Sequence, residues 1–272
     1  MPQIYPFLIS VPHGGVKVPE EVKNKVILDE LSLRYYSDPA TRRIFDLSGE
    51  VTAFLDTDVS RMIVDLNRPP YHLPPRRWDG VVKTRTVDGK PVYETGQFPD
   101  IRRIHRLMMQ YYFPYHAELD RLLDEMSICL AIDCHSMLPV APNGHKDAGQ
   151  TRPLVCLGNN GDMEGNPRKG ALSTCPGKIV RILAEEFQKK FPGEGSVALN
   201  TPFSGGFISN AHYWHKGIPW IQLELNRSLY EDGGQYVSGR SGVNPERCTF
   251  LQDSIREVLA GFWKKARNDL FF

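Results

Sequence analysis

Four residues of types that bind metal ions or move protons lie at predicted strands. His13 follows one apolar stretch and precedes two glycines, Asp133 and His135 close a second, and Glu224 lies within a third. A catalytic zinc ion commonly has two histidines and a carboxylate as ligands and keeps one position open for water. A further carboxylate can then act on that water as general base. This residue set favours a zinc site formed by His13, His135 and an acidic residue, with Glu224 as the base.

Each of these residues also has a simpler interpretation. His13 can cap a turn, and Asp133 and His135 can form a local hydrogen-bonded pair. Glu224 is harder to explain without a site, because a carboxylate on a buried strand costs several kcal/mol unless it is paired or bound to a metal. Side chains two residues apart on a strand point the same way, so we expect Asp133 to orient the ring of His135.

Serine and cysteine hydrolases are the main competing enzyme classes. The His-Gly-Gly sequence at 13–15 is similar to the oxyanion loop of esterases, which also needs a serine in a G-x-S-x-G turn. No such turn occurs, since GRSGV at 239–243 lacks the final glycine. The five cysteines form no C-x-x-C pair, and three lie in apolar stretches, which is typical of reduced, buried thiols.

The composition argues against two classes of partner. Of 272 residues, 41% are hydrophobic and 24% are charged, as in ordinary globular proteins. Lysines and arginines number 33 against 32 acidic residues, for a net charge of +1, which disfavours bulk binding of nucleic acid. The sequence has no signal peptide and no apolar run of about 18 residues, so we expect a cytoplasmic protein without a membrane partner.

Predicted strands and helices alternate along the chain. We expect strands at 4–10, 51–56, 61–66, 128–136, 153–158 and 218–225, and helices at 20–36, 38–48, 100–127, 176–190 and 245–268. Asp38 is the expected N-cap of its helix, with Pro39 at the first position, and Pro114 is expected to kink the helix at 100–127. This alternation predicts one α/β domain over 1–272, with a mostly parallel sheet covered on both faces.

The polar residues described above gather at one edge of the predicted sheet. Ligands of open α/β sheets bind beyond the carboxyl ends of the strands, where His13, His135 and Glu224 are expected. The polar stretch 67–99 follows the strand predicted at 61–66, and so long an irregular segment is typical of functional loops. We therefore expect the site at this edge, with 67–99 shaping its pocket.

Six segments resemble, in chain order, those of the N-formylglutamate amidohydrolase (N-formylglutamate deformylase) family. They are SVPHGG, SRMIVDLNRP, YYFPYHAELDRLL, IDCHS, TPFSGGFI and IQLELNRSLY, between residues 10 and 230. The resemblance implies a three-layer α/β/α fold with a mostly parallel mixed sheet, like that of zinc carboxypeptidases and aspartoacylases. It also implies an amidohydrolase with one Zn²⁺ per chain as its cofactor.

The same resemblance implies the metal ligands and the base. His13 and His135 match the metal histidines of the family, and Glu224 matches the general base. Asp38 of YYSDPATRRIF matches the acidic ligand, although this segment departs from the SDTDW sequence usual in the family. The role of helix N-cap therefore stays open for Asp38 as the alternative.

The substrate-binding residues are also implied by the resemblance. Arg61 would stabilise the oxyanion, and Asn67 with Arg68 would hold a substrate carboxylate, because a guanidinium group can donate two hydrogen bonds to one carboxylate. Four further residues are expected to lie at the substrate, with the arginine as a second carboxylate ligand: Gly205, Gly206, His212 and Arg227.

These assignments imply hydrolysis of the N-formyl group, or a similar N-acyl group, from an acidic amino acid such as N-formyl-L-glutamate. Metal-activated water would attack, and Glu224 would be the general base. Two alternatives stay open. One is an N-acyl amino acid deacylase or carboxypeptidase-like metallohydrolase of other specificity. The other is a catalytically silent homologue that binds a metal ion or an anion.

Overall fold

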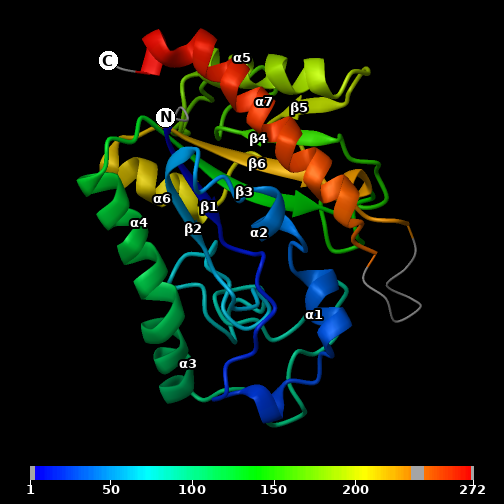
Figure 1. Ribbon diagram of the computed structural model, residues 1–272. Coiled ribbons are helices and arrows are strands. Elements are labelled where there is room, and N and C mark those ends of the chain that lie inside the picture. The colour runs from blue at the N-terminus through cyan, green and yellow to red at the C-terminus, as the bar shows by residue number, and fades with distance from the viewer. Residues whose placement is uncertain (1–3, 234–241, 271–272) are drawn as a thin grey trace.

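The computed structural model describes residues 4–233 and 242–270, and its centre is a six-stranded sheet (Figure 1). The strands are β1 (Tyr5–Val11), β2 (Val51–Asp56), β3 (Leu130–Met137), β4 (Val155–Gly158), β5 (Val197–Leu199) and β6 (Trp220–Asn226). Their order is β2-β1-β3-β6-β4-β5. β4 is antiparallel to β6, whereas the other neighbours are parallel. The mostly parallel mixed sheet predicted from the sequence is confirmed.

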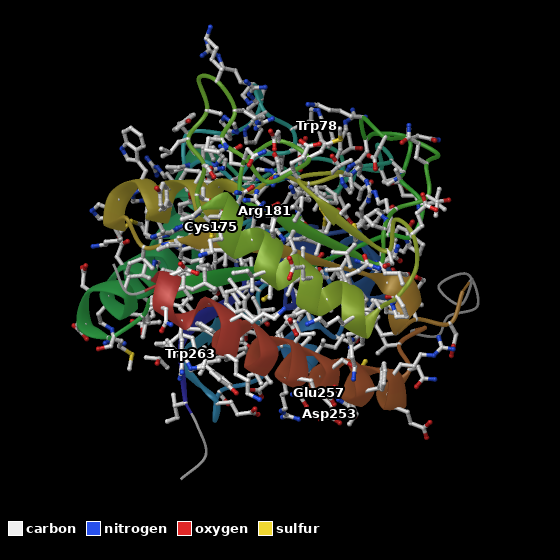
Figure 2. All side chains as sticks on the ribbon, turned by 90° about the horizontal axis from the view of Figure 1, so that it is seen from above. Trp78, Cys175, Arg181, Asp253, Glu257 and Trp263 are labelled. Atoms are coloured by element: carbon white, nitrogen blue, oxygen red, sulfur yellow. The ribbon has the colours of Figure 1, made fainter. Side chains whose placement is uncertain are left out.

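Helices cover both faces of this sheet. They are α1 (Glu30–Tyr36), α2 (Thr41–Ile44), α3 (Ile101–Leu107), α4 (Phe113–Glu125), α5 (Gly177–Lys190), α6 (Phe207–Lys216) and α7 (Pro245–Leu270), with short turns η1 (Lys23–Lys25), η2 (Met108–Tyr112) and η3 (Arg227–Leu229). α5 and α7 lie together over one face (Figure 2), and α4 and α6 cover the other. The three-layer α/β/α fold is thereby confirmed. In the part of the chain described here, no helix is long and apolar enough to cross a membrane.

One face of the sheet changes from apolar to polar along its strands. Leu8, Ala131 and Trp220 are register partners in β1, β3 and β6 and belong to the core beneath α4 and α6. Further along the same strands this face carries a polar row, which consists of Ser10, Asp133, Gln222, His135 and Glu224. Because these strands are parallel, the polar row lies at the shared carboxyl edge. The fold therefore positions the site by strand register.

The stretch 61–66 is not a strand, contrary to the prediction. Met62, Ile63 and Val64 are buried, but they lie in a turn in which the amides of Ile63 and Val64 donate to the carbonyl of Ser60. Their side chains join the core beneath α4. The apolar run reflects burial of a loop, and burial of this kind needs no strand pairing.

Asp38 is not a helix N-cap, and the helix predicted at 38–48 is reduced to α2. This helix begins after Ala40, which has a left-handed φ of 65°. Asp38 contributes only its carbonyl, which accepts a hydrogen bond of 2.6 Å from the hydroxyl of Thr41. The N-cap alternative is therefore wrong, because the carboxylate of Asp38 points toward β1 and β3 instead.

The other predicted helices form with changed boundaries. The helix expected at 20–36 forms only over its last part, as α1. The helix expected at 100–127 is divided into α3, the π-helical turn η2 and α4. This interruption immediately precedes Pro114, whose ring nitrogen has no hydrogen to donate to the preceding turn.

Candidate active site

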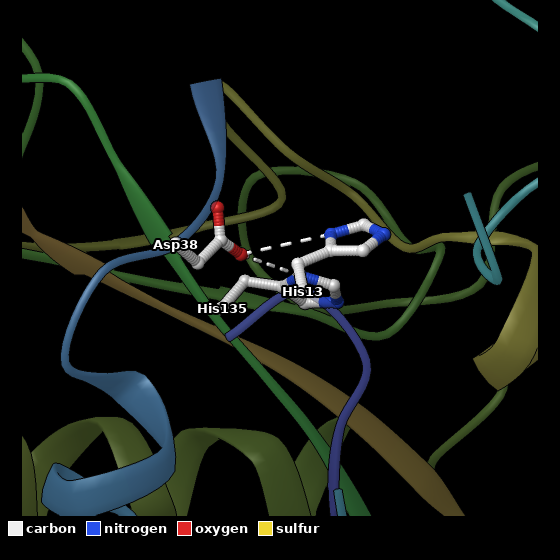
Figure 3. A group of neighbouring side chains, drawn as sticks. All are labelled: His13, Asp38 and His135. Carbon is white, nitrogen blue, oxygen red and sulfur yellow. Dashed lines mark hydrogen bonds and ion pairs between the residues drawn. The ribbon is translucent and has the colours of Figure 1, made fainter. Parts of the chain in front are cut away.

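Three side chains meet at the carboxyl edge of the sheet with the geometry of a metal site (Figure 3). His13 follows β1, His135 lies on β3, and Asp38 lies between α1 and α2. Their ligand atoms lie within 4.8 Å of one another, and each residue is at most 2% exposed. One oxygen of Asp38 is 3.1 Å from Nδ1 of His135 and 3.6 Å from Nδ1 of His13. The structure thus brings the three predicted ligands together.

A second carboxylate lies behind each imidazole ring. Nε2 of His13 is 2.8 Å from Oδ1 of Asp65, and Nε2 of His135 is 2.9 Å from Oδ2 of Asp133. These carboxylates accept hydrogen bonds, so the proton of a neutral ring belongs on Nε2 and the lone pair on Nδ1. Both lone pairs then face the same anionic oxygen of Asp38. These lone pairs and the anionic oxygen repel one another, and a cation bound between them would remove the repulsion.

The Nδ1 atom of His13 gives the sharpest test of whether the residues fit a metal ion. It is buried and has no hydrogen-bond partner among the residues that the structure describes. Buried polar atoms normally have a partner, so this orphaned nitrogen points to a ligand. Two imidazole nitrogens and one carboxylate oxygen are a donor set that suits Zn²⁺ with a position left for water. The residues fit the ion.

Asp65 is a site residue that the sequence reading missed. Its carboxylate binds His13, accepts a hydrogen bond of 3.1 Å from Arg61, and lies 2.8 Å from the ammonium group of Lys83. Asp65 lies in the sequence between Arg61 and Arg68, which are both predicted site residues, but the apolar pattern around it predicts a strand. A fully buried aspartate within an apolar run was the available signal.

The site concentrates negative charge around the two rings. Burial alone would lower the pKa of His135, but the carboxylates of Asp133, Asp38 and Glu224 outweigh it and raise that pKa well above its usual value. Burial would raise the pKa of Asp38, yet the neighbouring imidazoles and the charge of Arg61 hold it well below its usual range. A pocket that stabilises positive charge in this way is one that can hold a divalent cation.

Glu224 lies beside His135, because the two residues are register partners on β6 and β3. It is 6% exposed, and its Oε1 accepts a hydrogen bond of 2.7 Å from the amide of Gln222. Burial raises the pKa of Glu224 to about 7, against the opposing effect of His135. A carboxylate with this pKa can take up and release a proton near neutral pH.

Arg61 borders the three ligand side chains. It donates to Asp65, and its Nη1 lies 3.6 Å from Oδ1 of Asp38. Its side chain is 21% exposed, so it reaches the solvent side of a site whose other members are buried. This is a suitable place for a donor to a substrate oxygen.

The side chains of Asn67 and Arg68 form hydrogen bonds with other residues of the protein. Nδ2 of Asn67 donates to Asp133 at 3.2 Å, and Oδ1 accepts from the amide of Ile208 at 2.9 Å. Nη2 of Arg68 donates to Oδ2 of Asp79 at 2.8 Å, and Lys83 contacts the other oxygen of Asp79. The carboxylate that Arg68 binds in this structure belongs to Asp79 of the segment 67–99, and binding of a substrate carboxylate by Asn67 and Arg68 stays a prediction.

The two glycines before α6 are constrained in different ways. A Cβ on Gly206 would lie 2.3 Å from Nδ2 of Asn67, so the chain requires glycine here. Gly205 has a φ of 145°, a conformation that side chains strongly disfavour. The predicted place of both glycines at the substrate stays a prediction; in this structure Gly206 lies close to the side-chain amide of Asn67.

His212 and Arg227 contact other parts of the protein. Nδ1 of His212 is 2.8 Å from Oδ1 of Asp120, and its Nε2 is 2.9 Å from Nδ1 of His116. The guanidinium of Arg227 donates to the carbonyls of Tyr35 and Ser37. Arg227 therefore holds the loop that carries Asp38, a positioning contact that strand-end position alone does not reveal.

The competing nucleophiles gain no support. All five cysteines are free and buried, as expected. Burial raises the pKa of Cys175 and of Cys134, which opposes formation of a reactive thiolate. Residues 239–241 of the GRSGV sequence lie outside the described residues.

Comparisons with known proteins show what the sequence is similar to. The profile of the N-formylglutamate amidohydrolase family matches residues 5–231. Two proteins named N-formylglutamate deformylase, from Pseudomonas aeruginosa and Pseudomonas putida, are 28% and 27% identical to the chain. The alignments cover 96% and 94% of this chain and 95% and 92% of those proteins.

A solved structure shows the same fold. The crystal structure of an N-formylglutamate amidohydrolase from Ralstonia eutropha superposes with a TM-score of 0.75 at 20% identity. The superposition covers 98% of this chain and 94% of that one. A gene product from Agrobacterium tumefaciens superposes with a TM-score of 0.65 at 15% identity, over 94% and 91% of the two chains.

Proposed function

Because the chain belongs to the N-formylglutamate amidohydrolase family, as its sequence motifs predict, we propose that it is a zinc-dependent enzyme that hydrolyses N-formyl-L-glutamate to formate and L-glutamate. The observation that carries the proposal is the pair of carboxylate-backed imidazoles facing Asp38, with Glu224 on the next strand. The names of the two Pseudomonas relatives support this choice of substrate.

His13, Asp38 and His135 would hold the metal ion. When bound, zinc would polarise the formyl carbonyl and acidify a water molecule in the site. Asp65 and Asp133 keep the two rings turned with Nδ1 toward Asp38, so the ligands need little rearrangement when the ion binds.

Glu224 moves the proton. It takes a proton from the attacking water while the water oxygen bonds to the formyl carbon. It then gives that proton to the amide nitrogen as the carbon–nitrogen bond breaks, which releases formate and the amino group of glutamate. The pKa of about 7 that burial imposes on Glu224 suits both steps near neutral pH.

Arg61 stabilises the oxyanion that develops on the formyl oxygen. Its guanidinium group is already fixed by Asp65 and lies beside Asp38, so it does not have to be ordered during the reaction. A pre-positioned donor of this kind contributes roughly 3 kcal/mol to transition-state stabilisation.

Arg68 binds the α-carboxylate of the substrate, together with Lys83. In this structure Asp79 occupies both cations, and its side chain is 43% exposed, so the substrate carboxylate can replace it by displacing a solvent-facing group. Asn67 then has a positioning role, because it donates a hydrogen bond to Asp133 and accepts one from the start of α6. Gly206 leaves room for the Asn67 side chain. The side chains of His212 and Arg227 serve to position other residues.

The proposal is tested by metal analysis combined with a substrate panel. We expect about one zinc per chain and release of formate from N-formyl-L-glutamate, with slower hydrolysis of N-acetyl and N-succinyl amino acids. Faster hydrolysis of one of the other N-acyl compounds would favour the deacylase alternative. Bound metal without hydrolysis of any amide would favour the catalytically silent homologue.

A further inference from the structure

Arg152 is a buried arginine that the mechanism above does not use. Its side chain is 3% exposed and forms a two-point contact with Asp147, from Nε to Oδ2 at 2.8 Å and from Nη2 to Oδ1 at 3.1 Å. Nη2 also lies 3.2 Å from Nδ1 of His145. The guanidinium packs over the ring of Phe203, 5.0 Å from its centroid. Arg152 is therefore a rigid, pre-formed carboxylate receptor.

The direction of β4 places Arg152 at the catalytic edge. β4 runs antiparallel to β6, so the amino end of β4, where Arg152 lies, meets the carboxyl ends of β3 and β6. The backbone carbonyl of Arg152 accepts a hydrogen bond of 3.1 Å from the side-chain amide of Asn226, the last residue of β6. Arg152 thus lies close to the end of the strand that carries Glu224.

Side-chain contacts link Arg152 to His145 and, through Phe203 and Cys156, to the strand that carries Glu224. Cys156 is the register partner of Glu224, and its thiol donates a hydrogen bond of 3.2 Å to the carbonyl of Phe203. The ring of Phe203 packs against the guanidinium group of Arg152. On the other side, burial and the charge of Arg152 lower the pKa of His145, which also senses the charges of Asp79 and Arg61. His145 belongs to the Arg152 receptor through its contact with Nη2 of the arginine.

The group now on Arg152 is a displaceable carboxylate. Asp147 belongs to the irregular segment between β3 and β4, and its side chain is 20% exposed, whereas Arg152 is almost completely buried. A carboxylate from solution can approach from the side that Asp147 occupies. Asp79 on Arg68 and Lys83 shows the same arrangement, with an aspartate of the protein on a more deeply buried cation.

We propose that Arg152, assisted by His145, binds the side-chain carboxylate of the substrate, and that Asp147 occupies this receptor until the substrate replaces it. The inference rests on the proposed function and deepens it, because it explains selection of an N-acyl amino acid with an acidic side chain. The substrate carries two carboxylates. Arg152 lies beside the end of the strand that carries Glu224, and Nη1 of Arg68 lies 3.7 Å from Asp65, the carboxylate behind His13. Arg68 takes the α-carboxylate and Arg152 the distal one.

The test compares N-formyl-L-glutamate with N-formyl-L-glutamine, which lacks only the distal charge. Arg152→Gln is expected to lower kcat/KM for N-formyl-L-glutamate about 100-fold and to change it less than about threefold for N-formyl-L-glutamine. Arg121→Gln is the matched control, because Arg121 makes a similar two-point contact with Glu118 on the exposed face of α4. Equal loss on both substrates would overturn the assignment.

A second variant tests whether the substrate carboxylate replaces Asp147 on Arg152, and it leaves the buried arginine in place. Asp147→Asn is expected to lower KM for N-formyl-L-glutamate about fivefold, because the competing carboxylate is gone, and to leave KM for N-formyl-L-glutamine unchanged. An unchanged or higher KM for N-formyl-L-glutamate would contradict the exchange.

Failure of the proposed function is distinguishable from failure of this inference. If the wild-type protein hydrolyses neither compound, the proposed activity is wrong. Calorimetric titration with N-formyl-L-glutamate then still decides the role of Arg152, since Arg152→Gln must weaken binding about 100-fold. Equal binding by the wild type and the variant would exclude Arg152 as the receptor.

Discussion

The chain builds two clusters from a pair of histidines and an aspartate, and the two clusters differ in where the ring nitrogens point. In the cluster of His13, His135 and Asp38, both Nδ1 atoms face one carboxylate oxygen. In the second cluster, His116 and His212 stack with ring centroids 5.2 Å apart and contact each other through Nδ1 and Nε2 at 2.9 Å. Identical residue types therefore produce different sites.

In the second cluster every ring nitrogen of His116 and His212 has a hydrogen-bond partner within the protein. Nε2 of His116 is 3.0 Å from the carbonyl of Leu66, and Nδ1 of His212 is 2.8 Å from Asp120. No ring nitrogen in this cluster is left for a cation. In the first cluster the Asp65 and Asp133 contacts use one nitrogen of each ring, which leaves the other for a metal ion. Counting partners nitrogen by nitrogen separates a ligand histidine from a structural one.

The charge around the rings differs as well. Carboxylates raise the pKa of His135 despite its burial. In the second cluster, burial lowers the pKa of His116 to about 4 and lowers that of His212. One cluster is therefore built to hold positive charge, and the other is built to hold neutral rings.

Loss of a ligand histidine should have the largest effect. His135→Ala is expected to abolish stoichiometric zinc binding and to reduce formate release by more than about 1,000-fold, because the ion and the chemistry it supplies are lost together. Metal analysis and a formate assay measure both. His116→Ala is the control and should retain its zinc; a His135→Ala protein that keeps a full complement of zinc would contradict the assignment.

Glu224→Gln should separate metal binding from catalysis. The amide keeps the shape of the side chain but cannot take a proton, so we expect unchanged zinc content and a fall in kcat of about 100- to 10,000-fold. Glu118→Gln, on the exposed face of α4, is the control for removing a carboxylate. Turnover near the wild-type level would remove Glu224 from the role of base.

Asp65→Asn should show that the carboxylates behind the rings distinguish the two clusters. Asparagine weakens the hold on Nε2 of His13, and we expect zinc affinity to fall about 10- to 100-fold. Competition with a chelator of known affinity measures this change. Asp120→Asn, which alters the carboxylate behind His212, should leave zinc affinity within about twofold; the assignment fails if both variants weaken zinc equally.

The smallest effect concerns the pH dependence of stability. His116 has a pKa of about 4 when folded and about 6.5 when unfolded, so between these values the unfolded chain binds more protons. The free energy of unfolding should therefore fall as pH is lowered from 6.5 to 4, by at most about 3 kcal/mol from this residue. Urea unfolding at several pH values measures the slope. His116→Gln should flatten it, and an unchanged slope would contradict the interpretation.

The sequence predicts those parts of the site that strand register determines. His135 and Glu224 occupy matched positions on parallel strands, so their proximity follows from the strand pattern. For Asp38 the sequence leaves two roles open, because the family resemblance implies a ligand whereas the position before Pro39 suits an N-cap. The structure decides between them through the direction of the carboxylate.

The parts that could not be predicted lie on segments without a periodic pattern. Asp65, Lys83 and Asp79 form contacts across the loop that follows β2, and no repeat in the sequence signals which charges will pair. Arg227 follows a strand end as expected, yet its partners are carbonyls near α1. Long-range pairing of side chains on loops depends on the complete fold.

The reversed direction of β4 has a consequence for how substrate preference can change. The segment joining β3 to β4 leaves and re-enters the sheet at the same edge, so it stays on the side of the sheet where the site lies. Its length and composition can therefore vary while the metal ligands stay fixed in neighbouring strands. Homologues with insertions or deletions between these two strands should differ in the amino acid they accept while hydrolysing the same kind of bond.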